Sequence, residues 1–228
     1  MNTDRVWALV PLRQLAGGKE RLAGVLEPDA RRRLVEAMAA DVVAALLAVP
    51  LPPQQVLLVS ADPGVRAMAV QLGVGSLASR EEGPDPLNGA LTAALRHAAA
   101  SGAVAVLILH ADLPRANRGS LEALLAAGPP APSATLVPDA AGTGSNCLLL
   151  SPPDAMPLAF GADSRARHRA GALACGIDFR EFPDENLGFD VDFPADLARL
   201  VNPQQTPDNA AGERTRAWIK ERQAAVAR

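Results

Sequence analysis

Three aspartates have the residue type and the spacing that a metal site requires. Asp112 lies two residues beyond the apolar stretch 104–110, where a buried strand would end. Asp190 and Asp192 alternate within an extended segment, so their side chains would point to the same side. Open α/β sheets bind ligands at the carboxyl ends of their strands, and Mg²⁺ prefers carboxylate oxygens beside phosphates. We therefore expect the three aspartates to bind divalent cations.

Two of these positions also have a purely structural interpretation. Aspartate is common just before a proline-containing loop, and Asp112 precedes Pro114. Asp192 stands close to Pro194, a residue typical of a first helical turn, so Asp192 is also a candidate N-cap. Capping would leave Asp190 without a role, and the position of Asp112 at a strand end favours ligand binding.

The turn after the first apolar stretch is a second candidate site. Gly17 and Gly18 allow backbone N–H groups to approach phosphate oxygens, and Lys19 and Arg21 would neutralise the charge of those oxygens. The G-x-x-x-x-G-K-[ST] spacing of the common phosphate loop is absent. A solvated loop with incidental charges is the alternative. Combined with the aspartates, the turn predicts a triphosphate-binding site.

Two further glycine-containing loops are suited to an anionic acceptor. The first, residues 142–146, contains Ser145, and the second, residues 160–164, contains Gly161. Ser164 would begin a helix, and the free N–H groups of a helix N-terminus favour anions. Taken singly, both loops are ordinary turns.

The histidines and cysteines offer less chemistry. His168 would lie one turn into the helix that begins at the second loop, where it either faces the acceptor or is packed as a structural residue. His97 and His110 are expected to be structural. Cys147 and Cys175 stand in apolar segments and are expected to be reduced packing residues, because two cysteines are too few for a disulfide scaffold.

The overall composition is that of a globular protein with a small ligand. The 228 residues are 49% apolar and 21% charged, with a formal net charge of -3. A polyanion such as nucleic acid recruits basic surfaces, so nucleic acid is not the expected partner. The longest uncharged stretch, 42–61, is interrupted by prolines, so no membrane helix is expected. The first residues do not resemble a secretion signal, and we expect a cytoplasmic protein.

The elements that must position these residues alternate along the chain. Short apolar stretches alternating with helical patterns are typical of an α/β fold with a largely parallel sheet. An apolar residue at every fourth position from Leu34 to Leu46 predicts one amphipathic helix. The expected strands are residues 6–10, 55–60, 75–78, 104–110, 134–137, 146–150, 177–182 and 188–191. Further helices are expected at 63–72, 87–101, 119–127, 164–175 and from 194.

The C-terminal part differs in composition from the rest. Residues 1–201 are expected to form one α/β domain. The polar stretch 202–212 is typical of a linker, and 213–228 predicts a mostly exposed helix. We therefore expect residues 202–228 to be a linker and a helical tail without catalytic residues.

Taken together, these stretches resemble the 2-phospho-L-lactate guanylyltransferase family, which includes phosphoenolpyruvate and 3-phosphoglycerate guanylyltransferases of coenzyme F(420) biosynthesis. The resemblance runs from residue 5 to residue 201 and depends on the order and spacing of its parts. The matching stretches are residues 6–11, 19–22, 59–63, 87–90, 111–114, 142–146, 160–161 with Ser164 and His168, and 190–192.

The resemblance implies a fold, an activity and a set of ligands. The implied fold is Rossmann-like, with a mixed, mostly parallel sheet of the nucleotide-diphospho-sugar transferase type. The implied reaction transfers GMP from GTP to a small phosphorylated carboxylic acid, namely 2-phospho-L-lactate, phosphoenolpyruvate or 3-phosphoglycerate, and releases pyrophosphate. A homodimer is compatible with the sequence, which does not determine the oligomeric state.

The same resemblance implies individual roles. Two Mg²⁺ ions would be held by Asp112, Asp190 and Asp192. The GTP phosphates would contact Gly17, Gly18, Lys19 and Arg21, and Asn88 would lie at the nucleoside. The acceptor would contact Ser145, Gly161 and Ser164. The sequence departs from the family at Arg13, where lysine is usual, and at Phe193 and Ala195, which replace threonine and glutamate.

Rival functions remain at this stage. The same fold could transfer a nucleotide to a sugar phosphate or a pterin cofactor, or transfer a sugar. A non-catalytic GTP-binding protein is a further alternative. Guanylyl transfer needs no general base, because the acceptor phosphate is already ionised near neutral pH, so the lack of a Ser/His/Asp set does not count against it.

Overall fold

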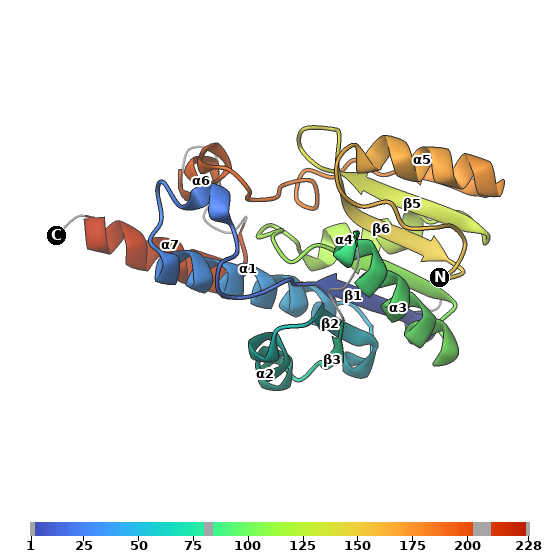
Figure 1. Ribbon diagram of the computed structural model, residues 1–228, viewed down its shortest axis with the longest axis horizontal. Helices are drawn as coiled ribbons and strands as arrows, with labels where there is room; N and C mark the ends of the chain where they lie inside the picture. Colours follow the sequence, from blue (N-terminus) through green and yellow to red (C-terminus); the bar gives the residue numbers. More distant parts are fainter. Residues whose placement is uncertain (1–2, 80–83, 203–210, 227–228) are drawn as a thin grey trace.

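The computed structural model describes residues 3–79, 84–202 and 211–226, which form a sheet with helices on both faces (Figure 1). The seven-stranded sheet has the order β3-β2-β1-β4-β6-β5-β7. Strand β6 is antiparallel to β4 and β5, and the other described pairings are parallel. The strands are β1 Val6–Pro11, β2 Val56–Ser60, β3 Gly75–Ala78, β4 Ala105–Leu109, β5 Ser133–Pro138, β6 Ser145–Ser151 and β7 Asp178–Glu181.

The helices form two layers because successive strand side chains point to opposite faces. Val6, Ala8 and Val10 of β1 join the apolar core beneath α1, α2 and α4, whereas Trp7 and Leu9 join the core beneath α3 and α5. The helices are α1 Pro28–Ala48, α2 Pro63–Leu72, α3 Pro86–Ala100, α4 Arg118–Ala127, α5 Ser164–Cys175, α6 Pro194–Val201 and α7 Glu213–Val226, with short 3-10 turns η1 Thr3–Arg5, η2 Glu20–Leu22 and η3 Pro53–Gln55. The predicted mixed, mostly parallel fold is confirmed.

The prediction of a strand at residues 188–191 is wrong. This segment is a turn followed by extended chain that joins no sheet. Gly188 N–H donates to the Asp184 carbonyl at 2.8 Å, which closes the turn, and Val191 N–H donates to the Asp112 carbonyl at 3.3 Å. The extended segment therefore bonds to the loop after β4 and not to a strand.

A third apolar core joins the C-terminal helix to the rest of the protein. Leu22, Phe189, Val191 and Trp218 are buried together in it. Helix α7 lies alongside α1 (Figure 1), where it contributes Trp218, a residue that is only 5% exposed. The tail was expected to be mostly exposed, and its outer face is, but its inner face is part of the core.

Polar contacts fix the start of this tail. The buried carboxylate of Asp41 on α1 accepts from Arg214 N at 3.0 Å and from Thr215 N at 2.8 Å, so α1 supplies the cap of α7. Gly212 N–H donates to the Pro114 carbonyl at 2.8 Å, two residues beyond Asp112. Most of the expected linker, residues 203–210, lies outside the described residues.

Within the described ranges, no helix combines the length and the apolar character needed to cross a bilayer.

Candidate active site

The candidate site lies at the carboxyl edge of the parallel strands. Strand β4 ends at Leu109 and leads into the loop with Asp112. Because β6 is antiparallel to β4, the amino end of β6 reaches the same edge, and His110 N–H donates to the Asn146 carbonyl at 3.1 Å. Residues from β4, from β6 and from the 188–192 segment therefore meet there.

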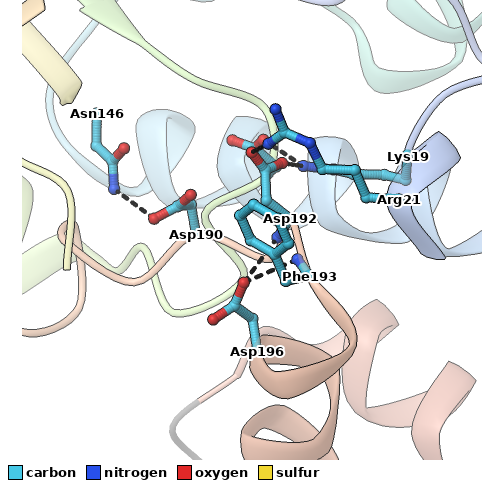
Figure 2. A network of polar contacts seen from close by, with 8 residues as sticks. Lys19, Arg21, Asn146, Asp190, Asp192, Phe193 and Asp196 are labelled. Carbon is cyan, nitrogen blue, oxygen red and sulfur yellow. Dashed lines mark hydrogen bonds and ion pairs between the residues drawn. The ribbon is translucent and has the colours of Figure 1, made fainter. Parts of the chain in front are cut away.

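The structure brings the three predicted aspartates and Lys19 into one cluster, in which Figure 2 labels Lys19, Asp190 and Asp192. Lys19 Nζ lies 2.5 Å from Asp112 Oδ2 and 2.6 Å from Asp192 Oδ1. Asp190 lies beside this pair and its Oδ1 accepts from Asn146 Nδ2 at 3.4 Å. Residues separated by up to 173 positions in the chain thus form one polar centre.

The backbone of the glycine turn aims Lys19 at the aspartates. Gly17 has φ of 79° and Lys19 has φ of 55°, both in the left-handed region. A lysine in this conformation is uncommon and costs roughly 1 kcal/mol or more, so the surrounding contacts must maintain it. The following 3-10 turn η2 is anchored by Leu22, which is fully buried in the third core.

The charges of the cluster perturb one another. Burial alone would lower the pKa of Lys19, but the carboxylates of Asp112 and Asp192 outweigh it, so the pKa of Lys19 is raised. Burial alone would raise the pKa of Asp112, but Lys19 and His110 outweigh it, so that pKa is lowered. Burial and the neighbouring Asp112 raise the pKa of Asp190 to about 6. Asp190 is therefore the carboxylate with the least compensating positive charge.

The chemistry of the cluster fits a hard divalent cation. Its donors are carboxylate oxygens with the Asn146 amide beside them, and negative charge is crowded around Asp190. As the side chains stand, no three His, Cys, Asp or Glu groups within the described residues are arranged to hold a metal ion. The Lys19 ammonium lies between Asp112 and Asp192 instead, where it compensates their negative charge.

The carboxylate of Asp192 does not cap helix α6. Asp196 Oδ2 accepts from Asp192 N at 3.2 Å and from Phe193 N at 2.8 Å, so Phe193 is the N-cap position of α6 (Figure 2). The interpretation of Asp192 as N-cap is therefore wrong. The predicted phosphate ligand Arg21 lies 3.3 Å from Asp192 Oδ2, and its guanidinium is 4.7 Å from the centre of the Phe193 ring.

The two predicted acceptor loops lie against each other. Ser164 Oγ is 3.1 Å from Ser145 Oγ, and both hydroxyls are buried. Arg165 at the start of α5 holds the first loop, because its backbone N–H donates to Thr143 O at 3.1 Å and its side chain donates to Gly142 O at 2.8 Å. The serines therefore form one polar pair between β6 and α5.

A β-bulge turns Ser145 towards α5. Val137 lies opposite Cys147, whereas the next residue of β5, Pro138, lies opposite Ser145. Asn146 is thus an extra residue in β6, and such an insertion re-aims the side chains next to it. As a result Asn146 faces Asp190 while Ser145 faces α5.

Asn88 lies buried between α3 and the loop that precedes α5. Its Nδ2 donates to the Phe160 carbonyl at 2.9 Å, and its Oδ1 accepts from Phe160 N–H at 2.9 Å. The buried amide therefore clamps α3 to the loop that contains Gly161, whose φ is 115°. Its position supports the acceptor loop, and the nucleoside role stays a prediction.

Some residues of the site were missed from sequence. Asn146 contacts Asp190, and Asp196 orders the Asp192 loop, yet neither was given a role. Asn146 is the last residue of the predicted acceptor loop 142–146. Its position at the start of an expected strand could have marked it as a residue of the site. His110 was expected to be structural, and its ring lies 5.2 Å from that of Phe160.

Solved structures with this fold include nucleotide-handling enzymes. A protein from Desulfovibrio desulfuricans G20 assigned as a nucleotide-diphospho-sugar transferase superposes with a TM-score of 0.75 at 17% identity, covering 98% of this chain and 97% of that chain. CMP:2-keto-3-deoxy-manno-octonic acid synthetase in complex with CTP has a TM-score of 0.56 at 16% identity, covering 86% and 97%. The chain therefore has the fold of these nucleotide-handling enzymes.

The chain belongs to the family described as guanylyl transferase CofC like, which matches residues 6–209. A phosphoenolpyruvate guanylyltransferase of Rubrobacter xylanophilus is 43% identical over 195 residues, covering 86% of this chain and 93% of the relative. A phosphoenolpyruvate guanylyltransferase of Sphaerobacter thermophilus is 42% identical over 194 residues, covering 85% and 91%. The predicted family and enzyme class are confirmed.

Proposed function

We propose that the protein transfers GMP from GTP to phosphoenolpyruvate and releases pyrophosphate, as a step of coenzyme F(420) biosynthesis. The observation that carries the proposal is the contact of Lys19 Nζ with Asp112 and Asp192, next to Asp190. Such a centre, at the ligand-binding edge of an α/β sheet, suits the handling of phosphates. The choice of phosphoenolpyruvate over phospholactate is supported by the names of the relatives in R. xylanophilus and S. thermophilus.

The proposed reaction is an in-line displacement at the α-phosphorus of GTP. A phosphate oxygen of the acceptor forms the new P–O bond while the bond to the β-phosphate oxygen breaks, and pyrophosphate leaves with that electron pair. The nucleophile is ionised near neutral pH, so no residue has to remove a proton. The protein's contribution is to position the two phosphates and to neutralise their charge.

Named residues would supply these contributions. Lys19 and Arg21 would move from the aspartates to the phosphates of GTP, since each ammonium or guanidinium N–H can donate equally to a phosphate oxygen. Asp112, Asp190 and Asp192 would hold Mg²⁺. When bound, Mg²⁺ would supply further positive charge against the phosphates. The Ser145–Ser164 pair and the amide of Gly161 would hold the acceptor.

Pyrophosphate release from pairs of substrates tests the proposal. The purified protein is incubated with Mg²⁺, each of the four ribonucleoside triphosphates, and phosphoenolpyruvate, 2-phospholactate, 3-phosphoglycerate, a sugar phosphate or a pterin cofactor. We expect turnover with GTP and phosphoenolpyruvate and a product whose mass equals their sum minus pyrophosphate. GTP binding without turnover, or a preference for a sugar or a pterin, would refute the proposal.

Matched variants test the assigned residues. Asp112→Asn and Asp190→Asn should each reduce turnover by more than about 100-fold, because each removes a charge from the centre. Asp154→Asn is the control, because Asp154 is exposed in the turn after β6, at the opposite end of that strand. Near-wild-type turnover of either site variant would overturn its assigned role.

A further inference from the structure

A buried hydrogen-bond chain runs from α5 to the serine pair. His168 is fully buried, and its Nδ1 lies 3.0 Å from Ser145 Oγ. Ser145 Oγ in turn lies 3.1 Å from Ser164 Oγ. On the other side of the ring, Nε2 lies 3.0 Å from the backbone nitrogen of Ala159. The guanylyl-transfer mechanism proposed above gives the imidazole no task.

The neighbours of His168 determine its tautomer. The Ala159 N–H can only donate, so Nε2 must be the nitrogen that accepts. A neutral imidazole then carries its single proton on Nδ1, and this N–H donates to Ser145 Oγ, with the Ser164 backbone as a further hydrogen-bond partner of the ring. Burial, together with the charges of Arg167 and His110, lowers the pKa of His168 to about 4, so the ring is neutral near pH 7.

The chain has more donor protons than internal hydrogen bonds. The Nδ1–H of His168 and the two serine hydroxyls provide three protons, and the chain contains two hydrogen bonds. Since Nδ1–H donates to Ser145, one serine proton bridges the two hydroxyl oxygens and the other is left over. Whichever serine supplies the bridge, one hydroxyl proton remains to be donated outside the chain.

Surrounding contacts hold the imidazole in place. The ring of Phe160 meets that of His168 edge to face, with centroids 4.8 Å apart. The backbone of Phe160 is fixed by both polar atoms of Asn88, and the bulge at Asn146 orients Ser145. The direction of the hydrogen bonds is therefore built into the packing of β6, α3 and α5.

We propose that His168 is a positioning residue, which holds the Ser145–Ser164 pair so that one hydroxyl proton points to an anionic oxygen of the acceptor. This inference rests on the proposed function and adds a residue to it. In the opposite tautomer Nδ1 would accept from Ser145, so the two hydroxyl protons would both be used in the two hydrogen bonds of the chain and none would be left for the acceptor. Loss of the Nδ1–H should therefore weaken acceptor binding and leave GTP binding unchanged.

Two amide variants separate this role from simple packing. The amide nitrogen of asparagine reaches about as far as Nδ1, and the amide of glutamine about as far as Nε2. His168→Asn thus keeps a donor for Ser145, whereas His168→Gln keeps an acceptor for Ala159 N–H and loses the donor. His97→Gln, at an exposed position of α3, is the matched control.

The readouts are the KM for each substrate, kcat, and the thermal midpoint of each variant. We expect His168→Gln to raise the acceptor KM about tenfold, the effect of one hydrogen bond, with the KM for GTP unchanged. His168→Asn should stay within about threefold of wild type. In Ser145→Ala, adding His168→Gln should have no further effect on the acceptor KM.

The inference fails if His168→Gln folds and keeps the wild-type acceptor KM, or if both amide variants change both KM values in proportion to lost stability. Nitrogen-15 NMR of the histidine ring gives a test that does not depend on turnover: we expect the proton on Nδ1, and a proton on Nε2 would refute the hydrogen-bond chain. A wild-type protein that releases no pyrophosphate would refute the proposed function instead, and the NMR result would still decide on the chain.

Discussion

Replacing Lys19 by methionine tests the balance of charge in the site. The side chain of Lys19 is 11% exposed, and those of Asp112 and Asp192 are 25% and 37% exposed. Methionine keeps much of the length but removes the ammonium, so the aspartates lose their compensating charge. The cost should appear as reduced stability in the absence of metal, and a cation added from solution should recover it.

The exposure of the three side chains sets the magnitude. Removing one partner of a fully buried ion pair costs roughly 3–5 kcal/mol, whereas exposed pairs are worth about 0–1 kcal/mol. The carboxylates here are partly exposed and therefore partly screened, so we expect a loss of about 2 kcal/mol. For a protein of 228 residues, each kcal/mol shifts Tm by about 2–4 °C, which gives a decrease of about 4–8 °C.

The pKa directions show that neutral pH is the right condition. The pKa of Lys19 is raised in the folded protein, so its stabilising contribution is complete below its ordinary value of 10.5 and is lost only above it. The pKa of Asp112 is lowered, so its contribution is complete above 3.8 and is lost as the pH falls below that value. Both contributions are complete at pH 7.5.

Thermal unfolding with and without Mg²⁺ is the assay. In the wild type an added cation would have to compete with the Lys19 ammonium for Asp112 and Asp192, so we expect Mg²⁺ to raise the Tm of Lys19→Met more than that of the wild type. Lys220→Met on the exposed side of α7 is the control, because Lys220 is the only other lysine of the sequence. Equal stability of variant and wild type without metal, together with an equal response to Mg²⁺, would refute the reasoning.

Three further predictions concern the contacts around the site. Gly212→Ala should lower the free energy of unfolding by about 1–3 kcal/mol and expose α7 to limited proteolysis, because a Cβ there would overlap the carboxylate of Asp41; an unchanged Tm and digestion pattern would contradict this. Asn88→Ala should lower the free energy of unfolding, measured by chemical denaturation, by about 2–3 kcal/mol and raise the acceptor KM, because the N–H and the carbonyl of Phe160 both lose their partner. A normal acceptor KM would show that Asn88 does not support the acceptor loop. Hydrogen bonds from two arginines of α5 lower the pKa of Glu181 from 4.5 to about 2, so Glu181 stabilises the folded protein above pH 4.5 and this stabilisation is lost as the pH falls to about 2. Glu181→Gln should therefore reduce the loss of stability between about pH 4.5 and 2. An acid denaturation curve identical to that of the wild type would exclude this contribution.

Much of the fold was predictable because it depends on local patterns. The apolar periodicity of residues 34–46 predicted a helix, and Leu34, Met38, Val42 and Leu46 are all buried in α1. The apolar stretch before Asp112 became the central strand β4. The segment 188–191 was misassigned because its extended backbone resembles a strand, while its hydrogen bonds go to the Asp184 and Asp112 carbonyls.

The side chains of the site were identifiable from their types and from their positions next to strand ends and glycines. Asp112, Asp190, Asp192 and Lys19 were selected in this way, and the structure places them together. Their contacts were not predictable, because each depends on packing between segments that are distant in the chain.

Local sequence thus fixes which residues can bind a cation or a phosphate and which stretches form helices and strands, since periodicity and turn chemistry act over a few residues. Only the folded chain fixes the direction of β6, the bulge that separates Ser145 from Asn146, and the left-handed Lys19 between two aspartates. The proton position on His168 belongs to the same group, because it depends on the Ala159 N–H and on burial. These features result from long-range hydrogen bonding and desolvation, which no short stretch of sequence contains.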